Sequence, residues 1–195
     1  MSPAHFALQF YRNWERLKSR LFAHVVRSGF YHFGDRSVIQ LPTRLCRTEK
    51  ISLGDGVHIG PGSWLEVREP RANAPVISFG DRSATTGYLT ITAAVGVHIE
   101  NDVLIARYVY VSDHTHKHCD RDIPIIAQGI EGVAPVRIKQ GAWLGQSVVV
   151  CPGVTIGRNA VIGANSVVRD DVPDFCVAAG APARVIRHVD KVQAR

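Results

Sequence analysis

Hydrophobic residues recur every six positions along residues 136–187. One position of each six is small or β-branched, namely Val136, Ala142, Val148, Val154, Ala160, Ser166 and Val172. The position two residues later is aliphatic, namely Ile138, Leu144, Val150, Ile156, Ile162 and Val168. Most sixes also contain a Gly, Ser, Asn or Asp at one fixed position, and such residues turn the chain easily. A repeat with this period predicts a β-helix.

Each six is expected to form one short strand with two inward side chains, followed by a corner. Three strands would close a triangular coil of about 18 residues, and successive coils would stack at the strand spacing of about 4.8 Å. This arrangement buries a column of aliphatic side chains. A β-sandwich of short strands would explain the alternation of side chains, but not the strict six-residue phase.

The repeat continues toward the N-terminus with two interruptions. Between Val57 and Val97 the count is not a multiple of six, so we expect an insertion at about residues 69–76. The phase breaks again after Thr115, and residues 115–135 are expected to form a loop that leaves the coil. Functional residues often lie on such loops, because a rigid scaffold positions them.

The first residues follow a helical pattern. Within residues 3–28 the large apolar side chains keep a spacing of three to four, at Phe6, Phe10, Trp14, Leu17, Leu21 and Val25. Basic residues are interspersed among them, at Arg12, Arg16, Lys18, Arg20 and Arg27. We therefore expect an amphipathic helix that either packs across the base of the coil or on a neighbouring subunit, or lies on an anionic membrane surface.

These elements divide the chain into three parts. We predict an N-terminal helical segment at residues 1–34, an all-β domain at residues 35–187 and a basic tail at residues 188–195. The all-β domain holds the β-helix and the loop at residues 115–135.

Composition and charge narrow the class of protein. The formal net charge of +6 suits a ligand that carries several phosphates, or an anionic lipid surface. No basic run is interleaved with aromatic residues, so we expect no nucleic-acid partner. The sequence has no long apolar run and no signal-peptide pattern, and its four cysteines show no metal-ligand spacing. We expect a cytoplasmic protein with reduced thiols, which could act at the inner face of the membrane.

Two segments have distinctive sequences, GAWLGQSVVVCPGVTIGRNAVIGANSVV at residues 141–168 and AAGAPARVIR at residues 178–187. They resemble the hexapeptide-repeat acyltransferases, a family that includes sugar and polysaccharide O-acetyltransferases. The resemblance extends over about residues 51–187. It implies a left-handed parallel β-helix, a homotrimer, and transfer of an acetyl group from acetyl-CoA to a sugar acceptor.

Three histidines alternate where the coil runs into the loop, in the segment VSDHTHKHCD. The resemblance implies that one histidine at this junction is the general base, and matching VYVSDHTH to the family pattern favours His116, with His114 as the alternative. An imidazole can take the proton from an attacking hydroxyl. Asp113 could hold the imidazole, although alternation along a strand would point its side chain away from His114.

The resemblance also implies which residues bind the donor. The matching positions for acetyl-CoA are Gln146, Ala164, Arg169, Arg184 and Arg187. Arginine suits this role because its guanidinium binds phosphate strongly.

Two further residues concern the acceptor. Thr86 stands where galactoside-type enzymes have an asparagine that contacts the acceptor, which favours another kind of acceptor, such as a nucleotide sugar or a lipid-linked glycan. His98 precedes His116 by three repeats of six. In a regular coil it would lie one rung below His116 on the same face.

Alternatives remain open from the sequence. His114, His116 and His118 could bind zinc if they point to one side of a strand, as in a β-helix enzyme of the carbonic anhydrase type. A non-catalytic scaffold that only oligomerises is a third reading. An amino-sugar N-acetyltransferase would use the same base as an O-acetyltransferase. Our leading expectation is the metal-free sugar O-acetyltransferase.

Overall fold

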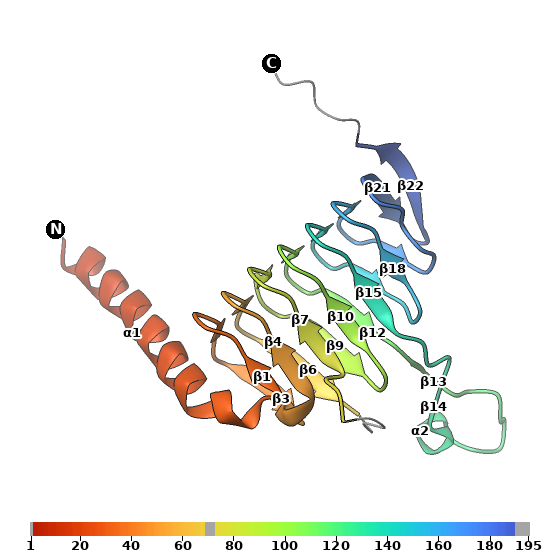
Figure 1. Ribbon diagram of the computed structural model, residues 1–195, viewed down its shortest axis with the longest axis horizontal. Helices are drawn as coiled ribbons and strands as arrows, with labels where there is room; N and C mark the ends of the chain where they lie inside the picture. Colours follow the sequence, from red (N-terminus) through yellow and green to blue (C-terminus); the bar gives the residue numbers. More distant parts are fainter. Residues whose placement is uncertain (1, 69–72, 190–195) are drawn as a thin grey trace.

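The computed structural model describes residues 2–68 and 73–189. Short strands stack into three sheets, which form the three faces of a coil (Figure 1). Sheet A contains β1 (His32–Phe33), β4 (Ile51–Leu53), β7 (Ile77–Phe79), β10 (Val97–Ile99), β15 (Val136–Ile138) and β18 (Thr155–Ile156). Sheet B contains β2 (Val38–Ile39), β5 (His58–Ile59), β8 (Ala84–Thr85), β11 (Leu104–Ile105), β16 (Trp143–Leu144), β19 (Val161–Ile162), β21 (Cys176–Gly180) and β22 (Ala183–His188). Sheet C contains β3 (Thr43–Cys46), β6 (Ser63–Val67), β9 (Thr90–Ala93), β12 (Tyr110–Ser112), β17 (Val149–Val150) and β20 (Val167–Val168).

Strands of successive coils pair in parallel, which confirms the predicted β-helix. In the C-terminal coils Arg137 pairs with Thr155, three sixes further on, as the six-residue phase predicts. In the N-terminal coils Ile77 pairs with Val97, so one turn is slightly longer than three sixes. The sheet C strands are longer there, with four residues in β9 against two in β17. Because side chains alternate with a period of two, two extra residues leave the inward face unchanged.

The inward side chains form one continuous apolar core. Aliphatic residues such as Ile77 and Ile156 are completely buried. Burying each such side chain stabilises the fold by about 1.5–3 kcal/mol. At the corners, Asn159 and Asn165 have φ values of 51° and 58°, a left-handed conformation that asparagine tolerates better than most residues. The predicted role of these two positions as turns is therefore confirmed.

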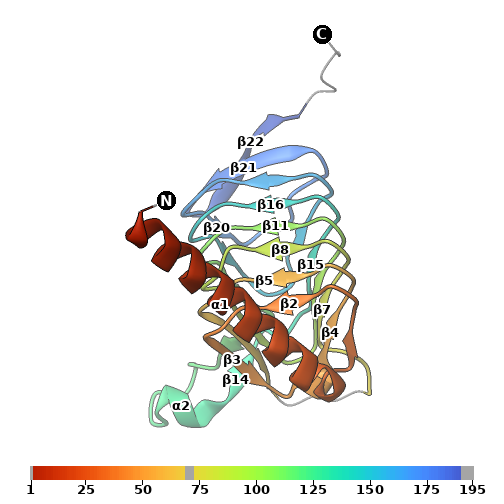
Figure 2. The same cartoon turned by 90° about the vertical axis from the view of Figure 1, so that its left-hand side faces the viewer.

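The helix α1 (Pro3–Val26) crosses the N-terminal end of the coil, and its N-terminus points away from the coil (Figures 1 and 2). It packs beside β2 through Ser19 and Ala23, which are buried. The sequence is misleading about the packing face, because the apolar stripe that begins at Phe6 is exposed along its whole length. Ser19 and Ala23 allow the helix to approach the coil closely and Phe22 and Val26 also pack against its core, whereas the side chains of the stripe point to solvent.

Residues 115–135 leave the coil, as the break in phase predicts. They contain β13 (Thr115–His116), the short helix α2 (Ile125–Gln128) and β14 (Ile130–Glu131). β13 and β14 pair in antiparallel fashion, so the base of the loop is a small hairpin beside the coil (Figure 1).

Strand pairing begins just before the predicted start of the all-β domain. β1 already pairs with β4, so the coil begins slightly before residue 35. A one-turn helix, η1 (Arg27–Gly29), joins α1 to it, and a second, η2 (Thr48–Lys50), precedes β4. Part of the expected insertion at residues 69–76 and most of the basic tail lie outside the described residues. None of the helices described is long and apolar enough to cross a membrane.

Candidate active site

The junction between coil and loop brings two neighbouring side chains into contact. Asp113 is completely buried, and its carboxylate accepts hydrogen bonds from the backbone N–H groups of Ala94, Val95 and Gly96 at 2.7–2.9 Å. The Nδ1 of His114 donates to Oδ1 of Asp113 at 2.7 Å. Hydrogen bonds to a carboxylate are strong, so this contact holds the imidazole in one orientation.

The contact corrects the expectation that the side chain of Asp113 points away from His114. β12 ends at Ser112, and strand alternation no longer applies beyond it. The hydroxyl of Ser112 donates to the carbonyl of His114 at 2.7 Å, which stabilises the turn. With its proton on Nδ1, the ring of His114 carries a lone pair on Nε2 and can accept a proton there.

His114 borders a pocket of about 370 Å³ on the outer face of sheet C. The pocket crosses the strands β6, β9, β12 and β17. Its outward side chains form two rows, Trp64, Thr90, Tyr110 and Val149 in one, and Glu66, Thr92 and Ser112 in the other. His114 and His116 lie at the edge where the second row ends.

Two aromatic side chains flank the pocket. The guanidinium of Arg44, on the preceding coil, lies 4.3 Å from the centroid of the Trp64 ring. Arg44 therefore covers one face of this ring. Trp64 and Tyr110 are two strand spacings apart, about 10 Å, with the smaller Thr90 between them.

Trp64 has an unusual hydrogen-bonding state. Within the described part of the chain, its Nε1 is the one buried side-chain nitrogen or oxygen that lacks a hydrogen-bond partner. An unpaired buried donor costs about 1–3 kcal/mol.

The other two histidines of the motif lie on the hairpin. His116 is exposed on β13, and His118 is exposed with its Nδ1 3.1 Å from Oε1 of Glu131. The ring of His114 is instead paired with Asp113. Across residues 2–68 and 73–189, no group of three or more His, Cys, Asp or Glu side chains could hold a metal ion. The three histidines do not converge, so their geometry gives the zinc alternative no support.

The expected donor-binding residues fall into two groups. Gln146 and Ala164 lie on successive coils at the corner that precedes sheet C, where the N–H of Asn165 donates to the carbonyl of Gln146. Arg169 follows β20 at the opposite corner, near Cys151 of the preceding coil. Burial raises the pKa of the Cys151 thiol, and the positive charge of Arg169 opposes that shift.

The last two donor candidates lie on β22, beyond the final coil. Arg184 donates to Oδ2 of Asp170 at 2.8 Å, and both side chains are well exposed. Arg187 is also exposed. The pairing with Asp170 places Arg184 near the corner that carries Arg169.

Neither residue expected to bind the acceptor lines the pocket. Thr86 is exposed at the corner between β8 and β9. His98 lies on β10 in sheet A, with its Nδ1 2.9 Å from Oγ of Ser78. The expectation that His98 lies one rung below His116 is wrong, because the turns of the coil are longer there and His116 has left it. Burial, and next the charge of Arg137, lower the pKa of His98.

The residues that form the pocket wall do not emerge from the six-residue pattern. Trp64, Thr90 and Tyr110 occupy outward positions of sheet C in direct register. The two intervals along this row differ, and neither is a multiple of six, so the repeat does not bring these residues together. The outward position of each residue could have been read from strand alternation, but the row requires knowledge of the coil lengths.

Comparison with known proteins shows related sequences. The family model described as bacterial transferase hexapeptide (six repeats) matches residues 135–170. A probable acetyltransferase of Mycobacterium tuberculosis is 34% identical over 178 residues, which cover 91% of this chain and 56% of that protein. The chain thus spans little more than half of that relative. A putative lipopolysaccharide biosynthesis O-acetyl transferase of Escherichia coli is 36% identical over 157 residues, which cover 77% of this chain and 78% of that protein.

Solved structures share the fold. An N-acyltransferase of Bacillus cereus, solved with dTDP and coenzyme A, has a TM-score of 0.74 at 21% identity, over 86% of this chain and 89% of that one. A hexapeptide-repeat acetyltransferase of Vibrio cholerae, solved with acetyl coenzyme A, has a TM-score of 0.56 at 28% identity, over 85% of this chain and 74% of that one.

Proposed function

This chain belongs to the hexapeptide-repeat acetyltransferases, and from that premise we propose that it transfers an acetyl group from acetyl-CoA to a hydroxyl of a sugar. The observation that carries the proposal is the pair of Asp113 and His114 at the edge of a pocket. The acetyl-CoA bound in the structure of the Vibrio cholerae relative supports the choice of donor. The relative named as a lipopolysaccharide O-acetyl transferase supports the choice of acceptor.

The proposed reaction needs one base. Nε2 of His114 takes the proton from the acceptor hydroxyl as its oxygen attacks the thioester carbonyl. The tetrahedral intermediate then collapses, the bond between carbon and sulfur breaks, and the thiolate of coenzyme A receives the same proton from His114. Asp113 orients the ring and stabilises its positive charge while the proton is held.

His114 suits the role of base better than His116, which the resemblance in sequence favours. A general base works best when its ring is held in one tautomer and one orientation. Asp113 holds the ring of His114 in this way, and three backbone N–H groups hold Asp113. No side chain does the same for His116 among the contacts of the described residues. His116 lines the same pocket and could contact the acceptor there.

The pocket on sheet C is the proposed acceptor site. The side of the Trp64 ring that lines the pocket can stack on the apolar face of a sugar ring. Glu66 and Thr92 offer further polar contacts on the path toward His114. An amino sugar would fit the same site, so N-acetylation is the second candidate, in keeping with the shared fold of the N-acyltransferase of Bacillus cereus.

We place the donor between copies of the chain. Gln146 and Ala164 lie one strand away from the edge that carries His114, and the five residue steps from Gln146 to Cys151 span about 16 Å. In a homotrimer, the donor corner of one copy can face the His114 edge of its neighbour. Arg184 and Arg187 then have the charge to bind the phosphates of coenzyme A.

The proposal is tested by measuring release of free thiol from acetyl-CoA over a panel of monosaccharides, nucleotide sugars and amino sugars. We expect release that depends on the acceptor, and an ester in the product. An amide product would select the N-acetyl candidate. A folded protein that releases no thiol with any acceptor would count against the proposed reaction.

A further inference from the structure

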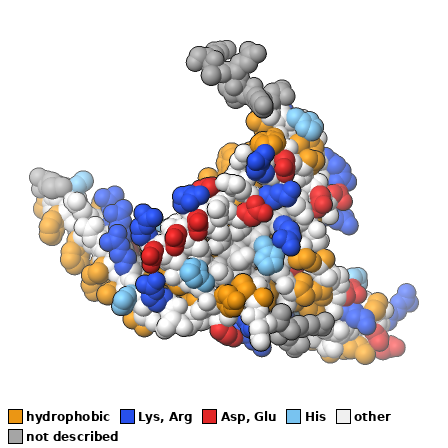
Figure 3. Space-filling view, in the orientation of Figure 1, with side chains coloured by type: hydrophobic (Ala, Val, Ile, Leu, Met, Phe, Trp, Pro, Cys, Tyr) orange, Lys and Arg blue, Asp and Glu red, His pale blue; other side chains and the backbone are white. Residues whose placement is uncertain are grey.

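The helix α1 presents a continuous apolar stripe to solvent. Six large side chains of this stripe are 48–74% exposed, namely Phe6, Phe10, Trp14, Leu17, Leu21 and Val25. The helical period places them on the side of α1 opposite Ser19 and Ala23, through which the helix packs on the coil. Figure 3 shows hydrophobic side chains along the outer edge of the helix. A contiguous exposed patch of this kind marks an interaction surface.

Basic residues border this apolar stripe. The helical period places Arg20 along one edge and Lys18 along the other, whereas Arg16 lies on the side of the helix toward the coil. Glu15 is the one acidic residue of α1, and it pairs with Lys18 at 2.7 Å. Figure 3 shows the basic side chains on the flank of the helix toward the coil. Helices that lie in a membrane interface have this distribution, with apolar side chains among the lipid chains and basic ones at the headgroups.

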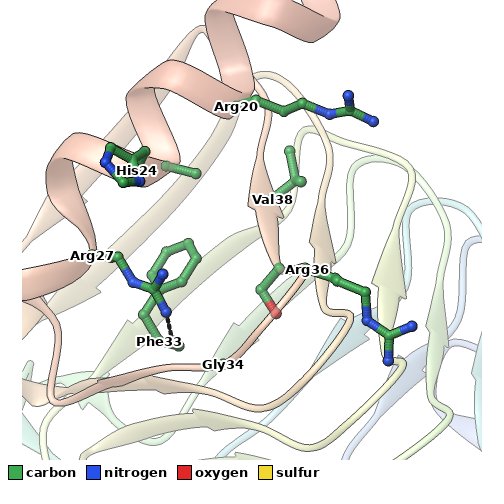
Figure 4. Close-up of a pocket in the computed structure, with 9 residues that line it drawn as sticks. Arg20, His24, Arg27, Phe33, Gly34, Arg36 and Val38 are labelled. Atoms are coloured by element: carbon green, nitrogen blue, oxygen red, sulfur yellow. Dashed lines mark hydrogen bonds between the residues drawn. The ribbon is translucent and has the colours of Figure 1, made fainter.

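A pocket at the foot of α1 has the charge to hold a phosphate. It has a volume of about 340 Å³, and Arg20 and His24 of α1 line it together with Arg27 of η1 (Figure 4). Arg36 and Ser37 line it from the first coil. Arg27 donates to the carbonyl of Phe33 at 3.3 Å and lies 3.5 Å from Asp35.

The guanidinium groups of Arg20 and Arg36 are not neutralised within the chain. Over residues 2–68 and 73–189, neither forms an ion pair with a carboxylate. A guanidinium in this state can bind a phosphate through two parallel hydrogen bonds. The pocket between α1 and the first coil therefore has the charge to hold an anionic headgroup.

From the apolar stripe, its basic edges and this pocket, we propose that α1 docks the protein on a bilayer that contains anionic phospholipid. The stripe lies at the boundary between headgroups and acyl chains, and Arg20 and Arg36 bind a lipid phosphate. A second copy of the chain is a poorer occupant, because pairing two such helices would bring their basic edges together. Membrane docking does not depend on the proposed acetyl transfer.

The test is co-sedimentation of the full chain with vesicles of phosphatidylcholine, with and without phosphatidylglycerol. We expect binding to the anionic vesicles, weakened by salt, and little binding to the neutral ones. Arg20→Glu should weaken binding by about tenfold or more, because it replaces an attractive charge near the anionic surface with a repulsive one. Trp14→Glu should abolish binding, because a charge enters the apolar stripe.

Matched controls lie on the extruded loop. Ile126 is 90% exposed and Arg121 is exposed, so Ile126→Glu and Arg121→Glu introduce the same charge away from α1. Both should bind anionic vesicles like the parent. Absence of parental binding, or equal binding to neutral vesicles, would overturn the proposal. The proposal would also be overturned if the parent does not bind vesicles and Trp14→Glu lowers the oligomer mass measured by light scattering. The apolar stripe would then be covered by a second copy of the chain.

Discussion

The carboxylate of Asp113 links the backbone of the coil to the imidazole of His114. It accepts from the N–H groups of Ala94, Val95 and Gly96, so the carboxylate cannot rotate and its Oδ1 stays directed at the ring. The arrangement fixes both the position and the tautomer of His114, which is what a general base requires. At the scale of single residues, the proposed catalysis therefore depends on a contact between sequence neighbours.

Replacement of Asp113 tests this dependence. Asp113→Asn places an amide NH₂ among N–H donors, so we expect turnover to fall by about 100-fold or more. The free energy of unfolding should also fall, by about 1–3 kcal/mol, because buried donors lose their acceptor. The KM for acetyl-CoA should change little. Asp120→Asn on the exposed loop is the control, and equal losses in the two variants would contradict the role of Asp113.

Two other histidines make stability depend on pH. Burial lowers the pKa of both His58 and His98 below the ordinary value of 6.5. The unfolded chain therefore binds protons more readily than the folded one, and stability should fall as the pH drops through about 6.5. His98→Gln should lose less thermal stability than the parent between about pH 8 and about pH 5. If the difference in thermal stability between parent and variant is the same at both pH values, His98 does not contribute to the pH dependence.

The corners are the elements that make the coil possible. Asn165 has a φ of 58°, where a residue with a Cβ is strained unless its side chain is short and polar. Asn165→Ala should lower the free energy of unfolding in urea by about 1 kcal/mol, whereas Asn165→Gly should not. If both variants are destabilised equally, the loss comes from the asparagine side chain and not from the backbone conformation.

The sequence predicts these elements well where the six-residue phase is strict. From Val136 to Val168 the inward positions are assigned correctly, because each turn takes three sixes. Before the loop each turn is longer, so counting in sixes places His98 wrongly. Alternation also fails to predict the pairing of Asp113 with His114, since this contact arises where the chain leaves the strand.

At the scale of the whole molecule, the base and the proposed donor corner lie at opposite edges of sheet C. His114 borders sheet C at one end of its strands, and Ala164 lies at the other end. The apolar stripe of α1 is likewise turned away from its own coil. Helical spacing predicts such a stripe but not which side of the helix the coil will contact. Ser19 and Ala23 make that contact together with the partly buried Phe22 and Val26.

Mixing of subunits tests the proposed placement of the donor. His114→Ala removes the base, and Ala164→Trp should block the donor corner, so each variant alone should be inactive. If each site uses His114 from one copy and Ala164 from its neighbour, an equal mixture refolded together should regain about a quarter of the parental activity. No recovery in the refolded mixture would mean that one chain supplies both residues.

The most direct measurement compares His114→Ala and His116→Ala with the parent in acceptor-dependent release of thiol from acetyl-CoA. We predict that His114→Ala loses turnover by about 100-fold or more while its KM for acetyl-CoA stays near the parental value. His116→Ala should keep most of its turnover and change chiefly the KM for the acceptor. The reverse pattern, with turnover lost in His116→Ala and retained in His114→Ala, would contradict the assignment of His114 as the base.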